Sequence, residues 1–549
     1  MFSVKGKIVD VVSGKIDDSY LHIENGKIVS EKGKPERIFD FSSFYIVPGF
    51  IDSHIHIESS MMTPSFFAES VIPHGTAAVV ADPHEIANVA GIEGIQFMMK
   101  DSENLPVRVF FTAPSCVPAT NMETSGAVIG ADEIENLLKN PRVVGLGEMM
   151  NFPGVLGEDP EVMKKIKAAK KSGKVLDGHC PGLKGKGLKK YVKAGLQSDH
   201  ECTSVEEAIE KLSAGMWLMI REGSSMKNLE ALLPAVNEKT WKKCIFVSDD
   251  IHPETILKEG HVDRILRKAV SLGLDPITAM RMVTLNPAKY FSLDEIGSLE
   301  KGKSATFAVV KDLKGFEVLA FFVNGEMIYQ KGKLLCKIKN QNPPEKIRSS
   351  VRIKTFLKKD LMIPSNSAVK VKVIKVPNEK TEAVLGYENG FLKPDIVNDV
   401  LPVVVMERHK ATGNIGKGFV QGFGLKSGAL ASTIAHDSHN IICVGADYDD
   451  MVSAIDALKN SGGGIVAVKN RRTIAILELP VAGLMAPDPA EKIRMKLDLI
   501  HSAARELGCS LESPFMALSF LALPVIPKLK LTDKGLVDVE RFQIVDVRG

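Results

Sequence analysis

The chain has 549 residues, which is too long for one ordinary domain, and its 44% hydrophobic and 25% charged residues are typical of a globular protein. A formal net charge of only +3 gives no reason to expect a nucleic-acid partner or a membrane surface. No apolar run approaches the roughly 20 residues that span a bilayer. Residues 1–15 lack the apolar core of a signal peptide, and the seven cysteines are scattered without CxxC pairs, so we expect a cytoplasmic protein with reduced thiols.

Short β-strands are predicted in two segments that lie far apart in the sequence. The first 45 residues alternate like strands, and Asn25-Gly26 is typical of a hairpin turn. A similar strand-like pattern occurs between residues 297 and 335, in "GSLEKGKSATFAVV" and "EVLAFFVNGEMIYQKGK". Because these segments flank a long middle region, we predict one small composite β domain built from residues 1–45 and 296–338.

The middle region, residues 46–295, contains eight short apolar runs that each end in a polar cluster and lead into a helical stretch. Continuous apolar runs are typical of strands covered on both faces, as in a parallel sheet. Eight strand–helix units in about 250 residues predict a TIM-like (β/α)8 barrel. A doubly wound open sheet is the alternative.

The last region, residues 340–549, begins in a polar, proline-containing linker, "KNQNPPEKIRSS". It carries strands, helices and two glycine-rich stretches, of which "GNIGKG" lacks the GK[ST] ending of a phosphate loop. We predict a separate C-terminal α/β domain. The predicted fold class is therefore α/β, with a barrel, a composite β domain and this third domain.

Polar residues of the eight runs lie at their carboxyl ends, which converge on the face of a barrel where active sites lie. Side chains i and i+2 on a strand share a face, so His54 and His56 can hold one metal ion. Alone, this pair is explained as well by two hydrogen-bonded core histidines. Five strands end in such residues, however, and we predict a metal site. Its candidate ligands are His54, His56, Glu148, His179, His200 and either Asp249 or Asp250.

This donor set exceeds the four ligands of one tetrahedral ion, so we expect two divalent ions that Glu148 bridges. Imidazole and carboxylate ligands without thiolates suit Mn, Fe or Zn and do not choose among them. Cys180 and Cys202 directly follow ligand candidates, so their side chains point to the opposite face and are interpreted as packing residues.

The constellation with its flanking β segments resembles the amidohydrolase superfamily, whose metal pattern falls on His54, His56, Glu148, His179, His200 and Asp249. Many binuclear members carry a carboxylated lysine where "GLGEMM" offers Glu148. Over essentially its full length, the chain is similar to the bacterial and archaeal adenine deaminase family. The similarity lies in "PGFIDSHIHIESSMM", "ADPHEIANVAG", "GLGEMMNFPGV", "DGHCPGL", "SDHECT", "MIREGSS", "SDDIHP" and "AHDSHNIICVG".

The resemblance implies a metal-dependent hydrolase that converts adenine to hypoxanthine and ammonia in adenine catabolism and purine salvage. Mn²⁺ or Fe²⁺ is the metal commonly cited for the family, and Zn²⁺ also fits. A hydroxide bridging two ions would attack C6, and Asp249 would carry a proton to the leaving amine. Asp250 faces the other way on an extended strand and is assigned to substrate binding, although turn geometry could exchange the two aspartates. We expect a homodimer or a higher homo-oligomer.

Two further strand ends carry candidates for substrate contacts. In "DPHE", Glu85 could protonate the purine ring and His84 could polarise the site, or the segment could simply begin the next helix. In "IREGSS", Arg221 and Glu222 could bind the ring edge or pair with each other, and Ser224 could donate a hydrogen bond to the base. The segment "AHDSHN" is interpreted as an interdomain network or as a loop that closes over the site.

Other function classes stay open. A cyclic-amide hydrolase such as a dihydroorotase or hydantoinase would share the His-x-His pair and the barrel, but it would normally carry the lysine that is absent here. Deamination of a different 6-substituted purine would keep every feature. A non-enzymatic binding scaffold would explain the fold without catalysis, but scaffold members typically lose some ligands, and this set is complete.

Overall fold

The described residues of the computed structural model, 1–31, 34–377 and 379–549, form two compact units. The first unit contains Met1–Pro83, Met98–Ser115 and Gly130–Gln341. The second unit contains His84–Phe97, Cys116–Ile129 and Asn342–Gly549. Two short segments of the middle region therefore group with the C-terminal residues, and the domain limits drawn from the sequence remain a prediction.

An eight-stranded sheet in the first unit joins the two β segments predicted from the sequence. Its strand order is β16-β15-β14-β13-β4-β1-β2-β3. β4 (Arg37–Pro48) pairs in parallel with β1 (Phe2–Asp10) and antiparallel with β13 (Phe307–Val310). Val4, Ile46 and Phe322 lie in the core on one face of this sheet. The other strands are β2 (Lys15–Glu24), β3 (Lys27–Val29), β14 (Val318–Val323), β15 (Glu326–Gln330) and β16 (Lys333–Leu334).

Eight parallel strands follow one another in chain order as β5 to β9 and β10 to β12. The two groups close on each other at both edges, because the N–H of Gln197 donates to the Leu176 carbonyl (2.9 Å) and the N–H of Asp249 donates to the His54 carbonyl (3.0 Å). Closure confirms the (β/α)8 barrel, since an open sheet would leave two edges unpaired. The strands are β5 (Phe50–Ile55), β6 (Thr76–Ala81), β7 (Arg108–Ala113), β8 (Val143–Met149), β9 (Val175–Gly178), β10 (Ser198–Asp199), β11 (Trp217–Arg221) and β12 (Cys244–Val247).

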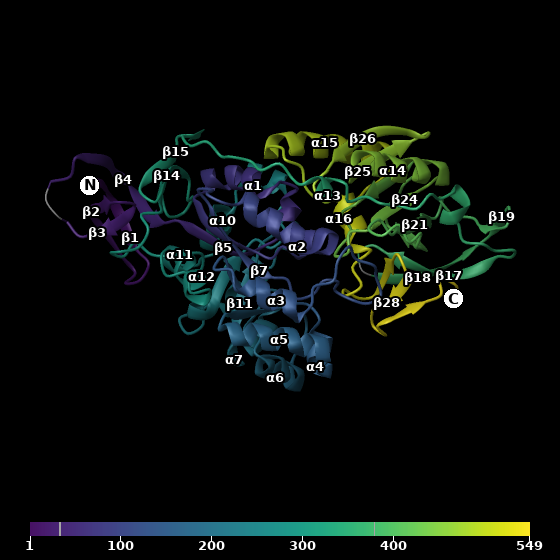
Figure 1. Cartoon of the computed structure of the whole chain (residues 1–549), viewed down its shortest axis with the longest axis horizontal. Coiled ribbons are helices and arrows are strands. Elements are labelled where there is room, and N and C mark those ends of the chain that lie inside the picture. The colour runs from purple at the N-terminus through teal and green to yellow at the C-terminus, as the bar shows by residue number, and fades with distance from the viewer. Residues whose placement is uncertain (32–33, 378) are drawn as a thin grey trace. The chain divides into compact units, whose positions relative to one another are not determined.

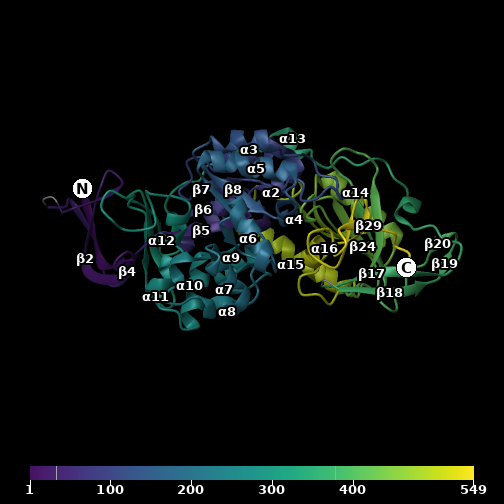
Figure 2. The same ribbon diagram turned by 90° about the horizontal axis from the view of Figure 1, so that it is seen from below.

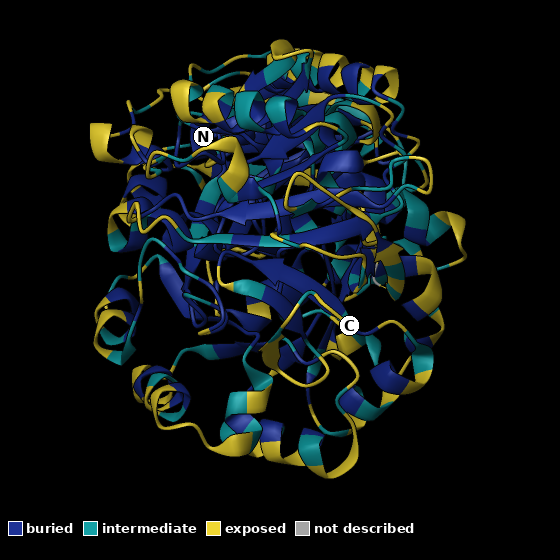
Figure 3. Ribbon diagram, turned by 90° about the vertical axis from the view of Figure 1, so that its right-hand side faces the viewer, coloured by how far each residue is buried: buried dark blue, intermediate teal, exposed yellow. Residues whose placement is uncertain are grey.

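Helices lie around these strands (Figures 1 and 2). In α10 (Val262–Ser271), for example, Ile265, Leu266 and Ala269 form a buried apolar stripe. Figure 3 shows the same division, with mostly buried strands and exposed outer faces on the helices. The other α-helices of the barrel region are α1 (Pro64–Val71), α2 (His84–Asp101), α3 (Ala131–Leu138), α4 (Phe152–Gly157), α5 (Pro160–Ser172), α6 (Gly185–Ala194), α7 (Val205–Ser213), α8 (Leu229–Leu232), α9 (Pro253–Glu259), α11 (Pro276–Arg281) and α12 (Leu285–Tyr290).

The second unit is built on a mixed eight-stranded sheet with the order β18-β17-β22-β21-β24-β23-β25-β26. α14 (Tyr448–Ser461) packs on it through Met451 and Ile455, which contact a core containing Val404 and Val466. This architecture confirms a separate C-terminal α/β domain. The strands are β17 (Val369–Lys375), β18 (Glu379–Leu385), β21 (Leu401–Met406), β22 (Ile415–Gln421), β23 (Ala429–Ser432), β24 (Ile441–Gly445), β25 (Gly464–Lys469) and β26 (Arg472–Glu478). Across the described ranges, no helix is both long and apolar enough to cross a bilayer.

Glu123 is a buried carboxyl group of the second unit that is protonated at neutral pH. Burial and the nearby Asp437 carboxylate raise the pKa of Glu123 from 4.5 to about 8. The folded protein therefore keeps a proton that the unfolded chain loses at lower pH. The stabilising contribution of this group is complete below pH 4.5 and is lost as the pH rises to about 8.

We expect Glu123→Gln to make unfolding less sensitive to pH in this window. In the parent, this group alone should lower the free energy of unfolding by up to about 1.4 kcal/mol per pH unit. Urea denaturation of both proteins at several pH values between 4.5 and 8 measures the difference. Glu238→Gln at an exposed position is the control. Parallel pH profiles for the parent and Glu123→Gln would contradict the raised pKa.

Candidate metal centre

The structure brings the six predicted metal ligands together at the carboxyl ends of the barrel strands. His54 is the last residue but one of β5, His56 lies just beyond the strand, and Glu148 lies near the end of β8. His179, His200 and Asp249 follow β9, β10 and β12. All are buried except His179, which is partly exposed. Buried carboxylates and imidazoles need hydrogen-bonded or oppositely charged partners, and in this cluster they are partners of one another.

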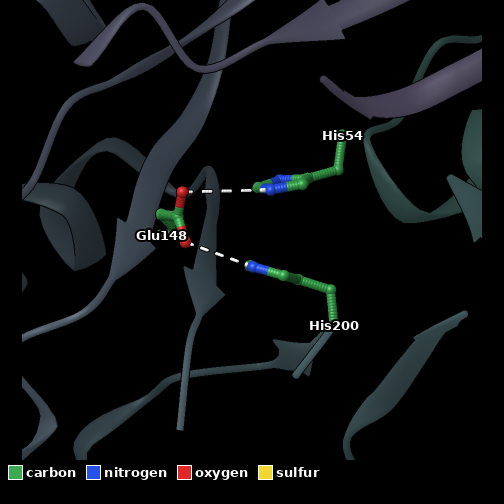
Figure 4. A group of neighbouring side chains, drawn as sticks. All are labelled: His54, Glu148 and His200. Carbon is green, nitrogen blue, oxygen red and sulfur yellow. Dashed lines mark ion pairs between the residues drawn. The ribbon is translucent and has the colours of Figure 1, made fainter. Parts of the chain in front are cut away.

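Glu148 is the centre of the cluster. Its Oε1 lies 3.3 Å from His56 Nε2 and 4.0 Å from His54 Nε2. Its Oε2 lies 2.6 Å from His179 Nδ1 and 3.2 Å from His200 Nε2. Figure 4 shows Glu148 between His54 and His200, with one carboxylate oxygen turned to each ring. The two oxygens thus face two separate pairs of imidazoles, which is the arrangement of a carboxylate shared by two ligand groups.

The backbone around Glu148 is held by Asp82, which the sequence indicates only as the start of the next helix in "DPHE". The N–H of Glu148 donates to Asp82 Oδ2 (2.9 Å). Asp82 packs so closely that a Cβ at Gly147 would lie 2.2 Å from the same oxygen. Position 147 therefore requires glycine, and the "GLGE" sequence sets the direction of the Glu148 side chain.

Asp249, and not Asp250, enters the cluster. Asp249 Oδ1 lies 3.2 Å from His56 Nε2 and 3.8 Å from His54 Nε2. The backbone of Asp249 adopts a left-handed conformation with φ 57°, which turns its side chain after the strand has ended. Asp250 instead accepts a hydrogen bond from Ser59 Oγ (2.5 Å). The turn geometry thus keeps the assignment in which Asp249 is the ligand candidate.

The tautomers of two histidines fit a cation. His56 Nδ1 lies 3.1 Å from the Asp82 carbonyl, which can only accept a hydrogen bond, so Nδ1 carries the proton and a neutral ring presents the Nε2 lone pair. His54 Nδ1 lies 3.3 Å from Asp177 Oδ2, and His54 Nε2 has no hydrogen-bond partner among the described residues. A nitrogen lone pair and a carboxylate oxygen repel each other unless a proton or a metal cation lies between them. An outer carboxylate or carbonyl on each ligating histidine is also the usual arrangement of metal sites.

Opposite charges shift the ionisation of the cluster strongly. Burial alone would raise the pKa of Glu148, but His200, His179 and His56 hold it well below its usual value. Burial alone would lower the pKa of His56, but Asp249 and Glu148 hold it well above its usual value. Glu201 and Glu148 likewise outweigh burial and raise the pKa of His179 to about 9. Divalent cations would replace these protons, so metal binding and proton release are coupled.

Arg221 pairs with Glu201, which sequence reasoning missed. The Arg221 guanidinium contacts both carboxylate oxygens of Glu201, with Nη2 3.0 Å from Oε2, and Arg221 Nη1 also donates to Asp249 Oδ2 (2.9 Å). Glu201 Oε1 lies 3.6 Å from His200 Nε2. The position of Glu201 directly after His200 in "SDHECT" is the one signal that could have identified it. Arg221 and Glu201 thus extend the charged cluster beyond the six predicted ligands.

Of the two alternatives for Arg221 and Glu222, the pairing with each other does not occur in the structure. Glu222 Oε1 binds Lys268 Nζ (2.6 Å), and Glu222 Oε2 accepts from the N–H of Leu229 (3.2 Å). The physical reason is strand alternation, because adjacent side chains point to opposite faces. Ser224 links two loops instead of standing free: its Oγ lies 2.7 Å from Thr255 Oγ1 and accepts from the N–H of His252 (2.8 Å).

Four other residues discussed from the sequence also have clear positions. Cys180 and Cys202 are buried, and burial raises the pKa of both thiols, as expected of packing residues. His84 begins α2, directly followed by Glu85, and both belong to the second unit. The "DPHE" segment therefore does begin a helix.

A parallel barrel whose strand ends gather imidazoles and carboxylates without thiolates defines a metal-dependent hydrolase, and residues 45–328 match the amidohydrolase family. Residues 375–543 match the adenine deaminase C-terminal domain. An adenine deaminase from Desulfatibacillum aliphaticivorans is 46% identical, with 98% of this chain and 96% of the relative covered. Adenine deaminases from Dehalococcoides mccartyi (45% identical, 99% of this chain and 95% of the relative) and Methanothrix thermoacetophila (44% identical, 98% and 95%) are similar over comparable lengths. The chain belongs to the adenine deaminase family.

Proposed function

We propose that this protein is an adenine deaminase, which hydrolyses adenine at C6 to hypoxanthine and ammonia and serves purine salvage in the cytoplasm as a homodimer or higher homo-oligomer. The observation that carries the proposal is the complete cluster of four histidines, Glu148 and Asp249 in a chain that matches adenine deaminases along nearly its whole length.

The cluster fits two divalent cations, for which we propose Mn²⁺ or Fe²⁺, with Zn²⁺ as the third choice. Neither thiol next to a ligand candidate is ionised, which leaves a nitrogen and oxygen donor set. Glu148 supplies an oxygen to each side of the site, and its four imidazole neighbours and Asp249 supply the other donors. When bound, such cations lower the pKa of water and make a nucleophile available near neutral pH.

Two carboxylates divide the proton transfers in this proposal. Water adds to C6 of adenine, the C6–N bond breaks, and the two water protons go to a ring nitrogen and to the leaving amine. Asp249 is ionised, since its pKa is held well below its usual value by His56 and Arg221 despite burial, so it can accept a proton and pass it to the amine. Glu85, four residues beyond the end of β6, relays the other proton to the ring, with His84 beside it.

Substrate contacts are assigned to groups near these carboxylates. We propose that Arg221, fixed by its contacts with Glu201 and Asp249, orients the aspartate and the purine edge. Asp250 is assigned to the substrate side. Glu222 and Ser224 are not assigned, because Lys268 and Thr255 already bind their side chains.

The test is turnover of adenine by the purified protein reconstituted separately with Mn²⁺, Fe²⁺ and Zn²⁺. Ultraviolet absorbance follows conversion to hypoxanthine, and dihydroorotate, hydantoin and other 6-substituted purines serve as competing substrates. We expect adenine to be the preferred substrate. A protein with stoichiometric metal that hydrolyses a cyclic amide but leaves adenine untouched would contradict the proposal, and one that turns over none of them would favour a binding scaffold.

A further inference from the structure

A second cluster of imidazoles surrounds one carboxylate within the second unit. Glu85 and His439 are almost fully buried, and His436 is nearly so. His436 Nδ1 lies 2.7 Å from Glu85 Oε1, and His439 Nε2 contacts Glu85 Oε2. Each carboxylate oxygen thus has its own imidazole partner. The partners come from the "AHDSHN" segment, more than 350 positions further along the chain.

The hydrogen bonds of His439 distinguish this cluster from a metal site, although its donor atoms lie close enough together to hold an ion. The N–H of Ala435 donates to His439 Nδ1 (3.2 Å), so Nδ1 is an acceptor. In a neutral ring the proton is then on Nε2, where it points at Glu85. A metal ligand would need that nitrogen deprotonated. The geometry therefore indicates a hydrogen-bond donor to the carboxylate.

Both histidine rings are held by their surroundings. His436 stacks on Phe520 at the end of α16 (Pro514–Phe520), with ring centroids 5.4 Å apart and planes at 23°. The N–H of His439 donates to the Ala435 carbonyl (2.8 Å), and the buried Arg408 contacts the His439 carbonyl. Rings fixed in this way lose little entropy when they bind the carboxylate, so they can set its direction.

The groups that face Glu85 favour its ionised form. Burial alone would raise the pKa of Glu85, but His436, His439 and His84 hold it well below its usual value. His84 Nε2 lies 3.5 Å from Glu85 Oε1 and 4.0 Å from the Asp437 carboxylate. Burial and the charges on His436 and Arg408 lower the pKa of His439 to about 4, despite the opposing effect of Glu85, so this ring is a neutral donor near pH 7. The protonated Glu123 carboxyl adds no charge next to Asp437 at neutral pH.

We propose that His436 and His439 are positioning residues that clamp the two oxygens of Glu85 and present it as an oriented, ionised carboxylate, ready to accept a proton from the nucleophile and relay it to the purine ring. The proposal rests on the assignment of adenine deamination to this chain. It gives the C-terminal region a direct part in the reaction, because the clamp comes from the segment between β23 and β24.

Amide substitutions test the clamp atom by atom. The amide nitrogen of glutamine lies near the position of a histidine Nε2, and that of asparagine lies near Nδ1. His439→Gln and His436→Asn therefore keep a donor toward Glu85, whereas His439→Asn and His436→Gln remove it. We expect the two donor-removing variants to lower kcat at least about tenfold and to shift the acid limb of the kcat/KM profile upward by about one pH unit or more. The donor-keeping variants should retain most of the activity, and KM for adenine should change little.

A second readout does not depend on turnover. In the full-length, Zn²⁺-loaded protein labelled at the glutamate carboxyl carbon, ¹³C NMR can follow the resonance that is lost in Glu85→Gln. Its titration should move to higher pH in His439→Asn but not in His439→Gln. A Glu85 resonance that titrates identically in all variants would overturn the clamp, as would equal damage by both members of each pair. A shifted resonance in a protein without adenine turnover would keep the clamp and reject the substrate.

Discussion

Replacing Glu148 with glutamine should abolish adenine deamination, with kcat/KM at least about 1,000-fold lower than in the parent. Among the described residues, Glu148 alone has a carboxylate within 4.0 Å of all four histidines of the cluster. Glutamine keeps the size of the side chain but removes its negative charge and places an amide nitrogen where one ligand oxygen lies. Metal content per chain, measured by mass spectrometry after reconstitution, and the rate of adenine turnover report the two consequences.

The matched control for this variant is Glu206→Gln, the same substitution at an exposed position in the first turn of α7. Its metal content and turnover should equal those of the parent. Circular dichroism should show that Glu148→Gln keeps its secondary structure, because the barrel sheet does not depend on this side chain. Full metal occupancy with undiminished turnover in Glu148→Gln would contradict the central position that we give to this carboxylate.

The barrel and its ligand set could be predicted because both follow from local sequence. Each strand is a short apolar run with a polar end, and parallel strands bring those ends to one face whatever the rest of the chain does. His54 and His200 are thus expected to meet although 146 positions separate them, and the structure places their rings 4.1 Å apart between centroids. Periodicity and the barrel topology suffice for this part of the site.

The partners of the ligands could not be predicted in the same way. Asp82 and Asp177 each lie two residues before a candidate histidine, and their hydrogen bonds to Glu148 and His54 depend on side-chain directions that a strand pattern does not specify. A pairing of Arg221 with its neighbour Glu222 stayed open as one of two alternatives, but adjacent strand residues point to opposite faces, and the partner of Arg221 is Glu201 on the preceding strand end. A rule of alternation applied to each candidate pair would have excluded the wrong choice.

The residues that surround Glu85 could not be predicted from sequence patterns either. The residues that bind it are more than 350 positions away, and no periodicity connects α2 with the segment between β23 and β24. The segment "AHDSHN" contains two histidines and an aspartate, which are residue types that also bind metals, and only the hydrogen bond from Ala435 to His439 shows which nitrogen carries the proton. The chemical character of this cluster therefore depends on tertiary structure.

Asp249→Asn should lower kcat by about 10³- to 10⁴-fold, because the amide can neither accept the proton from the nucleophile nor pass it to the leaving amine. The chain offers a matched variant at the next position. Asp250→Asn changes a carboxylate that accepts a hydrogen bond from Ser59 and lies outside the histidine cluster, so we expect an effect of at most about tenfold, mainly on KM. Steady-state kinetics with adenine, together with metal content, measures both.

The comparison separates the two roles that adjacent aspartates can take. Asp249 Oδ1 faces His56 and its Oδ2 faces Arg221, so one residue joins the metal ligands to the guanidinium, whereas Asp250 makes neither contact in the described structure. In Asp249→Asn, Arg221 would keep only its ion pair with Glu201, and the cluster would lose one of its two ligand carboxylates. We therefore expect weaker metal retention in Asp249→Asn than in Asp250→Asn. The reverse order, with turnover lost in Asp250→Asn and kept in Asp249→Asn, would show that the left-handed turn at Asp249 is rebuilt when the protein binds metal and substrate, and that Asp250 carries the proton.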